Sequence, residues 1–449
     1  MINLNLDLSK RGGKIKPMNA VNNGPNNPGV RKQASNFDTY KALEIPYARN
    51  HDASFYQLYG GEHTVDVHRI FRDFSADEND PESYIFEPTD GYIKNTLAAG
   101  TKTFYRLGAS IEHRYKFGTR VPKDYAKWAR ICEHIIRHYN EGWANGFEYG
   151  IDYWEIWNEP DCVQPDGSNP CWQGTEKEFI DFYGVVAKHI KSCFPNLKIG
   201  GPAFCGGGIK GFLKDFLESA AQNNVPLDFF SSHWYGRSPK LPGTLNTTLL
   251  EEIQGNRDAL DKLGFKDTEI ILNEWNYVTG WLSDDYSYSK KMMKGLKGSA
   301  FILSSMFTAQ NSPLDMFMYY DLRPSDFCGA FETGTFNVLK PYYSFITFRN
   351  LRRLGTQIPF ETDGEVYGLC ATDGKKYAIA LTHFDDNDDA TPVEIKLGMS
   401  GLAGKKEATV YVLDEERNLD ATRGEIFTAD EFSLYLTIPN FTTVYIEIE

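Results

Sequence analysis

Two glutamates stand out because each follows an asparagine at the end of an apolar run. Glu159 lies in YWEIWNEP (153–160), and Glu274 lies in EIILNEWNY (269–277). Pro160 cannot donate a hydrogen bond to a strand ladder, so the first of these strands should stop there. If the strands belong to a barrel, carboxyl groups at their carboxyl ends lie on the face where barrel enzymes hold their active sites. We therefore expect both carboxyl groups to be functional.

A pair of carboxyl groups suits the cleavage of glycosidic bonds, because one protonates the leaving oxygen while the other faces the anomeric carbon. Glu159 and Glu274 are 115 positions apart (274 minus 159), which fits strands four and seven of a barrel. A separation of roughly 5 to 5.5 Å would give a covalent intermediate and retention of configuration. We predict Glu159 as general acid/base, with its pKa raised by burial and by the charge of Glu274. Hydrogen bonds and a cation should keep the nucleophile Glu274 ionised.

Eight short apolar runs alternate with stretches of helical length between residues 13 and 351, which predicts an α/β fold, a (β/α)8 TIM barrel. The runs are 15–21, 44–50, 101–108, 152–157, 197–204, 227–235, 269–275 and 315–322. Helices of the outer ring are predicted at 175–194 and 289–310 from their three- and four-residue periodicity, and another at 340–355. The long stretch 55–90 is predicted to form a wall of the substrate pocket.

From residue 352 to 449 the pattern changes to alternating strands separated by Gly, Asp and Asn turns, which predicts a C-terminal antiparallel β-sandwich domain. The opening INLNLDL (2–8) alternates in the same way. We therefore expect the N-terminal segment 1–12 to add a strand to this domain.

The composition favours an ordinary soluble globular protein over a nucleic-acid or membrane protein. The net charge is -14, which repels phosphate backbones and anionic membranes. No run of 18 apolar residues occurs, and the N-terminus lacks the apolar segment of a signal peptide. The chain as given is expected to be cytoplasmic, although a periplasmic or secreted chain whose signal peptide had been removed would have the same features.

Cysteine and histidine spacing gives no metal motif, and no cofactor is expected. The seven cysteines include no CxxC pair, although Cys162 and Cys171 flank a loop that a local disulfide would close. His63, Asp66 and His68 are close in sequence but lack a convincing further ligand, so we interpret them as candidates for binding sugar hydroxyls.

WNEP in strand four together with NEW in strand seven resembles the clan A glycoside hydrolases, and most of all family 39, the family of β-xylosidases and α-L-iduronidases. Further similarities are YARNHD, with Arg49 and His51, and FFSSHWY, with His233 and Tyr235. The resemblance implies that these four side chains lie near the sugar and that Asn158 binds its 2-hydroxyl. The Asn-Glu-Trp context of Glu274 departs from the Thr-Glu-Phe or Thr-Glu-Trp typical of the family.

Each of these residues also has a purely structural interpretation. Glu155 should lie deeper on the inward face of its strand, where pairing with Arg49 is more natural than catalysis. Arg49 and His233 would then serve as a barrel counterion and a core histidine. Trp275 and Trp281 suit a sugar-binding platform and barrel packing equally well.

The function predicted first is a retaining, exo-acting, β-xylosidase-like hydrolase that releases a terminal sugar from a glycoside or oligosaccharide. An endo-acting or disaccharide-releasing hydrolase of the same clan would have an open cleft. A non-catalytic carbohydrate-binding protein on the same scaffold would normally have lost one of the two carboxylates.

Overall fold

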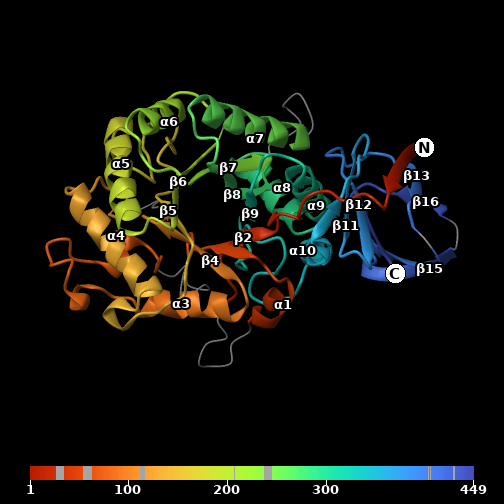
Figure 1. Ribbon diagram of the computed structural model, residues 1–449, viewed down its shortest axis with the longest axis horizontal. Helices are drawn as coiled ribbons and strands as arrows, with labels where there is room; N and C mark the ends of the chain where they lie inside the picture. Colours follow the sequence, from red (N-terminus) through yellow and green to blue (C-terminus); the bar gives the residue numbers. More distant parts are fainter. Residues whose placement is uncertain are drawn as a thin grey trace.

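A closed barrel of eight parallel strands forms the larger part of the molecule (Figure 1). The computed structural model describes residues 1–26, 35–53, 63–111, 117–206, 208–236, 245–402, 404, 406–427 and 430–449. The barrel strands are β2 (Ala20–Asn22), β3 (Tyr47–Arg49), β4 (Lys102–Leu107), β5 (Tyr153–Ile156), β6 (Lys198–Phe204), β7 (Phe229–Gly236), β8 (Glu269–Tyr277) and β9 (Met316–Tyr319). Each overlaps one of the eight predicted runs, so the predicted barrel is confirmed.

The barrel interior is apolar at one level and charged at the next. An apolar cluster occupies the beginnings of several strands, formed by Ala20, Phe104, Tyr153, Phe229, Ile271, Met316 and Met318. Towards the carboxyl ends, Arg49 and Glu155 lie fully buried inside the barrel. Buried charges of this kind are tolerated only when they are paired and hydrogen-bonded, so the polar level must be a connected network.

Helices surround the barrel, as the sequence predicts. They are α1 (Phe37–Ala42), α2 (Val67–Ile70), α3 (Glu87–Ala98), α4 (Tyr125–Asn140), α5 (Glu176–Cys193), α6 (Phe212–Gln222), α7 (Leu245–Lys262), α8 (Ser283–Met293), α9 (Leu296–Gln310) and α10 (Lys340–Leu354). Helix α5 begins at a capping box in which the Thr175 side chain accepts from the backbone of Glu178 and the Glu178 side chain accepts in return.

The single helix predicted over 289–310 is wrong, because the chain breaks there into α8 and α9. Gly295 caps α9 in an extended conformation. A Cβ atom at Gly298 would lie 2.6 Å from the carbonyl oxygens of Met292 and Met293, so the two helix ends pack directly against each other's backbone. The periodicity of apolar residues continues across this break, which is why the sequence pattern conceals it.

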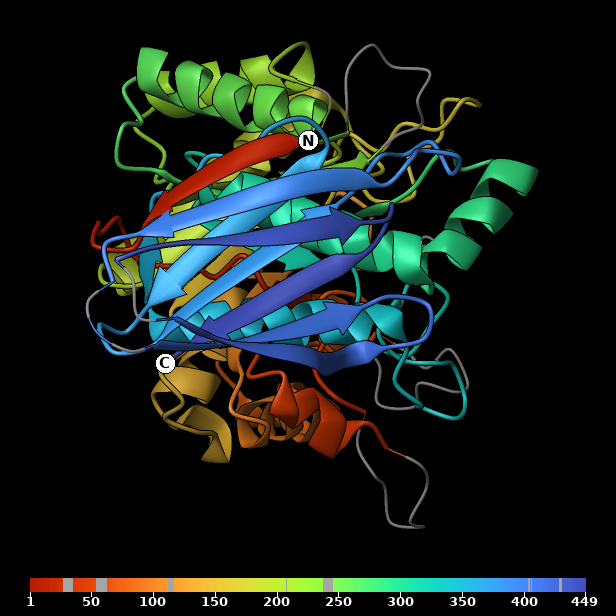
Figure 2. The same ribbon diagram turned by 90° about the vertical axis from the view of Figure 1, so that its right-hand side faces the viewer.

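The C-terminal domain consists of two packed sheets, and the first strand of the chain joins one of them (Figure 2). The smaller sheet has the order β1 (Ile2–Asp7), β13 (Val393–Ser400), β16 (Glu431–Ile438). The larger has the order β10 (Thr356–Ile358), β11 (Val366–Thr372), β12 (Tyr377–His383), β17 (Thr443–Ile448), β14 (Lys406–Leu413), β15 (Asn418–Phe427). The sheets are antiparallel except for β1, which runs parallel to β13.

Helices α9 and α10 lie between the barrel and the sandwich and contact both. Helix α9 is buried along nearly its whole length, and its Lys297 Nζ reaches the Asp388 carboxylate at 2.8 Å and the Asp386 carboxylate at 2.9 Å. The two domains therefore share an apolar and partly ionic junction. Within the described residues, no helix combines the length and apolar character needed to cross a membrane.

We predict that Leu6→Ala destabilises the protein by about 2–5 kcal/mol, because it leaves a cavity in the sandwich core. Leu4 and Leu6 on β1 are buried, whereas Asn3 and Asn5 alternate with them on the exposed face. Guanidinium unfolding would measure the change. Asn5→Ala is the matched control and should change the stability by less than about 0.5 kcal/mol. Equal losses from both substitutions would show that β1 is not packed as described.

Candidate active site

Glu159 is held by a tight turn at the end of β5. Trp157 and Glu159 have φ values of 79° and 46°, in the left-handed region that non-glycine residues rarely adopt. The backbone N–H of Trp157 donates to the carbonyl of Leu107 at 2.7 Å, and that of Glu159 donates to the carbonyl of Ala203 at 2.9 Å. The neighbouring strands thus fix a backbone conformation that costs free energy, and this turn aims the Glu159 side chain at the barrel axis.

Glu274 is aimed by a different device, a bulge in β8. The pairing of β7 with β8 shifts between Ser232 and His233, which leaves Asn273 as an extra residue and places Glu274 opposite His233. As a result, two consecutive side chains reach the interior. Asn273 Nδ2 lies 2.5 Å from Glu155 Oε1, and Glu274 Oε1 lies 2.8 Å from Arg49 Nη1.

The two carboxyl groups converge on one point above the barrel axis. Carboxylate oxygens of Glu159 and Glu274 and a ring nitrogen of His233 all lie within 4.8 Å of one another. His233 Nδ1 is 2.7 Å from Glu159 Oε1, and its Nε2 is 3.5 Å from Glu274 Oε1. This short separation fits the roughly 5–5.5 Å between the carboxyl groups of retaining enzymes better than the roughly 6.5–9.5 Å of inverting enzymes.

Glu274 is 5% exposed and has hydrogen-bond donors on both oxygens. Arg49 Nη1 donates to Oε1, and the Tyr235 hydroxyl donates to Oε2 at 2.7 Å. Burial raises the pKa of Glu274, whereas His233, Arg49 and the Tyr235 hydroxyl act in the opposite direction. The predicted cation and hydrogen bonds are therefore present. Burial has the larger effect, so the pKa of Glu274 is raised on balance.

Glu159 has a more strongly raised pKa than Glu274. Burial is the main cause, and Cys162 and Asp161 add to it. The prediction of a raised pKa is confirmed, but the neighbours that contribute most are these two residues rather than Glu274. Between the two pKa values, Glu159 holds its proton while Glu274 is ionised, which is the division of roles that a general acid and a nucleophile need.

The neighbouring histidines are neutral, and their contacts assign the position of the proton. Burial lowers the pKa of His233, and it lowers the pKa of His51 well below its ordinary value. Arg106 Nε donates to His51 Nδ1 at 3.2 Å, so the His51 proton is on Nε2, which lies 3.5 Å from Glu274 Oε1. For His233, the short contact of Nδ1 with Glu159 Oε1 at 2.7 Å allows a protonated Glu159 to donate to the neutral ring.

Arg49 connects these groups to the rest of the barrel. Its Nε donates to Glu155 Oε2 at 2.6 Å and its Nη2 donates to Asn158 Oδ1 at 2.6 Å, while Nη1 contacts Asn22 Oδ1 at 3.3 Å as well as Glu274. The predicted pairing of Glu155 with Arg49 is confirmed. Glu155 also accepts from the Ser231 hydroxyl at 2.6 Å, so its carboxylate is fully engaged and structural.

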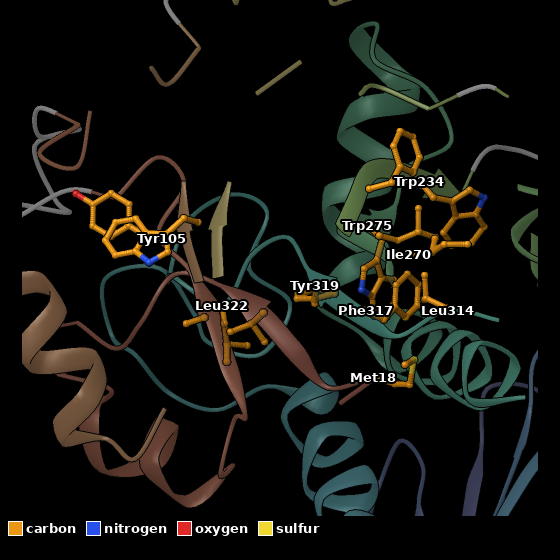
Figure 3. Packing of buried hydrophobic residues seen from close by; sticks show 14 of the residues in the cluster. Met18, Tyr105, Trp234, Ile270, Trp275, Leu314, Phe317, Tyr319 and Leu322 are labelled. Atoms are coloured by element: carbon orange, nitrogen blue, oxygen red, sulfur yellow. The ribbon is translucent and has the colours of Figure 1, made fainter. Parts of the chain in front are cut away.

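The two tryptophans that the sequence leaves undecided have different positions. Trp275 is 0% exposed and stacks on Phe317 with ring centroids 4.0 Å apart (Figure 3). It does not reach the site, because the bulge at Asn273 turns Glu274 inward and Trp275 outward. Trp281 is 50% exposed and meets the Tyr235 ring edge-on with centroids 5.1 Å apart, so it lies at the mouth of the site.

The predicted pocket wall at 55–90 lies only partly among the described residues, since 54–62 fall outside them. In the described part, Asp66 accepts from Arg106 Nη2 at 2.6 Å and from the backbone N–H of Ser110 at 3.0 Å. Asp66 is thus a structural counterion. His68 lines a separate hollow of about 440 Å³, and neither Glu159 nor Glu274 is among the residues that line it. Asp66 is therefore engaged within the protein, which leaves it unsuited to binding a sugar hydroxyl, whereas the assignment of His68 to substrate binding stays a prediction.

Residues beyond those predicted complete the site. The Tyr320 hydroxyl donates to Asp52 Oδ2 at 2.8 Å, and the same oxygen lies 3.5 Å from His51 Nε2. Asp321 is buried, which raises its pKa to about 6, and it accepts from Asn23 Nδ2 at 3.0 Å. Asp52 follows His51 in the YARNHD segment and was within reach of sequence reasoning, whereas Tyr320 and Asp321 follow β9 without any motif.

Three cysteines that are distant in sequence meet beside Glu159. Cys171 Sγ lies 3.8 Å from Glu159 Oε2, and hydrogen bonds from Cys171 and Cys205 lower the pKa of the Cys162 thiol to about 3. All seven cysteines are free thiols in the structure, so the disulfide between Cys162 and Cys171 that the sequence leaves open is not formed.

A protonated and an ionised carboxyl group around one point at the carboxyl end of a barrel define the site of a retaining glycosidase. The chain belongs to glycoside hydrolase family 39, because the model of glycosyl hydrolases family 39 matches residues 2–344. It is similar to a β-xylosidase of Geobacillus stearothermophilus, with 26% identity over 360 residues that cover 73% of this chain and 68% of the relative. A β-xylosidase of Caldicellulosiruptor saccharolyticus is 26% identical over 340 residues, which cover 72% of this chain and 65% of that protein.

Solved structures share the whole architecture. A glucosidase from Croceicoccus marinus superposes with a TM-score of 0.79 at 20% identity and covers 100% of this chain and 99% of its own. A monomeric β-xylosidase from Caulobacter crescentus has a TM-score of 0.73 at 17% identity and covers 100% and 99% of the two chains. These likenesses establish the barrel with its appended β domain as a shared fold.

We predict that Tyr235→Phe shifts the acidic limb of kcat/KM to higher pH. The Tyr235 hydroxyl stabilises ionised Glu274, so its loss raises the pKa of Glu274, and activity that needs the carboxylate is lost earlier as pH falls. The maximal rate should drop roughly 10- to 100-fold. The matched control is Tyr277→Phe on the neighbouring strand β8, whose hydroxyl donates to Asp386 outside the site. An unmoved acidic limb in the Tyr235 variant would contradict this role.

Proposed function

We propose that the protein hydrolyses O-glycosidic bonds by double displacement, with Glu274 as nucleophile and Glu159 as general acid/base, and that it acts as an exo-glycosidase on β-xylosides. The observation that carries the mechanism is the approach of the two carboxyl groups within 4.8 Å, with the higher pKa on Glu159.

In the first step, Glu274 attacks the anomeric carbon as the bond to the leaving oxygen breaks, and Glu159 transfers its proton to that oxygen. In the second step, Glu159 accepts a proton from water, whose oxygen attacks the same carbon and displaces Glu274. Each step inverts the configuration, so the product keeps that of the substrate. The hydrogen bond between His233 Nδ1 and Glu159 can reverse its direction when Glu159 loses or regains its proton, because the imidazole ring can either accept or donate at that nitrogen.

Asn158 and Trp281 are the proposed contacts with the sugar. Asn158 is buried, and its Oδ1 accepts from Arg49, which orients the amide so that its Nδ2 donates elsewhere. A donor beside the nucleophile suits the 2-hydroxyl of the sugar in the site. The half-exposed face of Trp281 suits the apolar C–H face of a sugar ring.

The substrate class rests on the relatives, two of which are described as β-xylosidases. An endo-acting mode is the second candidate. It is favoured by a similarity of 27% over 232 residues, covering 49% of this chain and 28% of the relative, to a protein from Wenyingzhuangia aestuarii described as a funoran endo-β-hydrolase.

Azide rescue tests the assignment of the two carboxyl groups. With a nitrophenyl β-xyloside, Glu274→Gly should lose on the order of 10⁴-fold or more of the activity. Azide should restore turnover and give a xylosyl azide of inverted configuration. Glu159→Ala with azide should give the azide of retained configuration. Glu176→Ala, on the exposed first turn of α5, should retain full activity and form no azide. Failure of rescue in both folded variants would refute the assignment.

Product analysis tests the mode of action. We expect xylohexaose to be shortened from one end, so that xylose is the sole early product and NMR shows it first as the β anomer. A mixture of internal fragments at early times would instead establish the endo mode. Release of disaccharide alone would establish a disaccharide-releasing hydrolase. Proton NMR and chromatography of the same time course measure both properties.

A further inference from the structure

The thiol cluster beside Glu159 contains donors of the kind that soft metal ions prefer. Cys162 Sγ, Cys171 Sγ and a Glu159 carboxylate oxygen all lie within 4.8 Å of one another. Cys205 contacts the same group, because its thiol hydrogen-bonds both Cys162 and Glu159. Two sulfurs and one carboxylate oxygen thus surround one point, and Cys205 adds a third sulfur beside Cys162 and Glu159.

The backbone holds these donors in place. The N–H of Cys162 donates to the carbonyl of Glu159 at 3.1 Å, which fixes one sulfur relative to the carboxyl group. The N–H of Cys205 donates to Asp161 Oδ1 at 3.0 Å, and the N–H of Cys171 donates to Asn169 Oδ1 at 2.8 Å. Cys171 is buried, whereas Cys162 and Cys205 are partly exposed, so an ion can enter from solvent.

A tetrahedral Zn²⁺ ion fits this set better than a hard cation or a disulfide. Zinc binds thiolate sulfur at about 2.3 Å and carboxylate oxygen at about 2.0–2.2 Å, which puts its ligand atoms roughly 3.5–4 Å apart. Glu159, Cys162 and Cys171 already approach that spacing and need to contract by at most about 1.3 Å. Cys205 has to move towards them to become the fourth ligand. Mg²⁺ and Ca²⁺ prefer all-oxygen sites, and a disulfide would use only two of the three sulfurs.

We propose that Cys162, Cys171, Cys205 and Glu159 form a binding site for Zn²⁺ and that occupation of this site switches off glycoside hydrolysis. The ion binds through Glu159 Oε2, the oxygen on the cysteine side, while Oε1 faces His233. Zinc-bound Glu159 has no proton to donate to the leaving oxygen. The site itself stands apart from the catalytic assignment, whereas its inhibitory effect rests on the proposed function of Glu159.

Another group of potential ligands, Glu133, His189 and Cys193, provides the internal comparison. It has one sulfur, and its carboxylate is already paired with Arg137 at 2.8 Å and with His189 at 2.7 Å. Substitution of Cys193 therefore removes a thiol without touching the proposed site.

Cobalt substitution tests the site without reference to activity. The protein of 449 residues is reduced, freed of metal and titrated with Co²⁺. We expect one equivalent to produce a thiolate-to-cobalt charge-transfer band and the strong visible bands of tetrahedral cobalt, and Zn²⁺ to abolish both. Cys162→Ser and Cys205→Ser should weaken the charge-transfer band, and Cys193→Ser should leave it unchanged. Absence of the band in the reduced parent enzyme would overturn the proposal.

Two further measurements complete the test. Glu159→Gln should keep the charge-transfer band but alter the visible bands, because one ligand changes; an unaltered spectrum would exclude the carboxylate from the site. In the parent enzyme, Zn²⁺ should reduce nitrophenyl β-xyloside hydrolysis more than 10-fold, with recovery on adding a chelator, and Cys193→Ser should respond equally. A cobalt band without glycosidase activity would refute the proposed function alone, whereas full activity at saturating Zn²⁺ would refute the switch.

Discussion

The site depends on one buried guanidinium group. Arg49 donates to Glu155, Glu274 and Asn158, which come from two strands and the turn that follows one of them. Removing one partner of a buried ion pair typically costs about 3–5 kcal/mol, because the other charge is left uncompensated. Two carboxylates share Arg49 and together set its position. Glu155 holds the guanidinium group within hydrogen-bond distance of Glu274. The planar fork of arginine suits this task, which a lysine ammonium could not perform.

The apolar cluster beneath explains why this network is strong. Phe104, Tyr153 and Phe229 close the barrel below the charged level, so water does not screen the contacts of Arg49 from that side. The same burial raises the pKa of both carboxyl groups of the site, Glu159 and Glu274. The pKa of Glu159 is raised more than that of Glu274 because their neighbours differ. Arg49 and the Tyr235 hydroxyl stabilise ionised Glu274, whereas Glu159 lies beside a neutral histidine and acidic neighbours.

The architecture was predictable because it follows from periodicity. Eight apolar runs became eight barrel strands, and alternation placed β1 in the sandwich. The carboxyl pair was predictable because strand ends in a closed barrel converge. Local irregularities were not predictable. The break between α8 and α9 leaves the apolar pattern intact, and nothing in the sequence marks the bulge at Asn273 that turns Glu274 inward and Trp275 outward. Nor does sequence spacing indicate that Cys205 reaches Cys162 and Glu159, since that contact arises from the path of two loops.

The two carboxyl groups of the site differ in how firmly the fold holds them. This difference decides which of them a metal ion can bind without disrupting the barrel. Glu274 belongs to a strand and has donors on both oxygens, so an ion that captured it would have to break the Arg49 network. Glu159 belongs to a strained turn, and its Oε2 faces thiols rather than a cation. A soft metal ion at that oxygen replaces weak contacts with coordination bonds and leaves the barrel network intact. On the proposed assignment, the acid/base Glu159 is therefore the carboxyl group that a metal ion can engage reversibly, while Glu274 keeps its contacts with Arg49 and Tyr235.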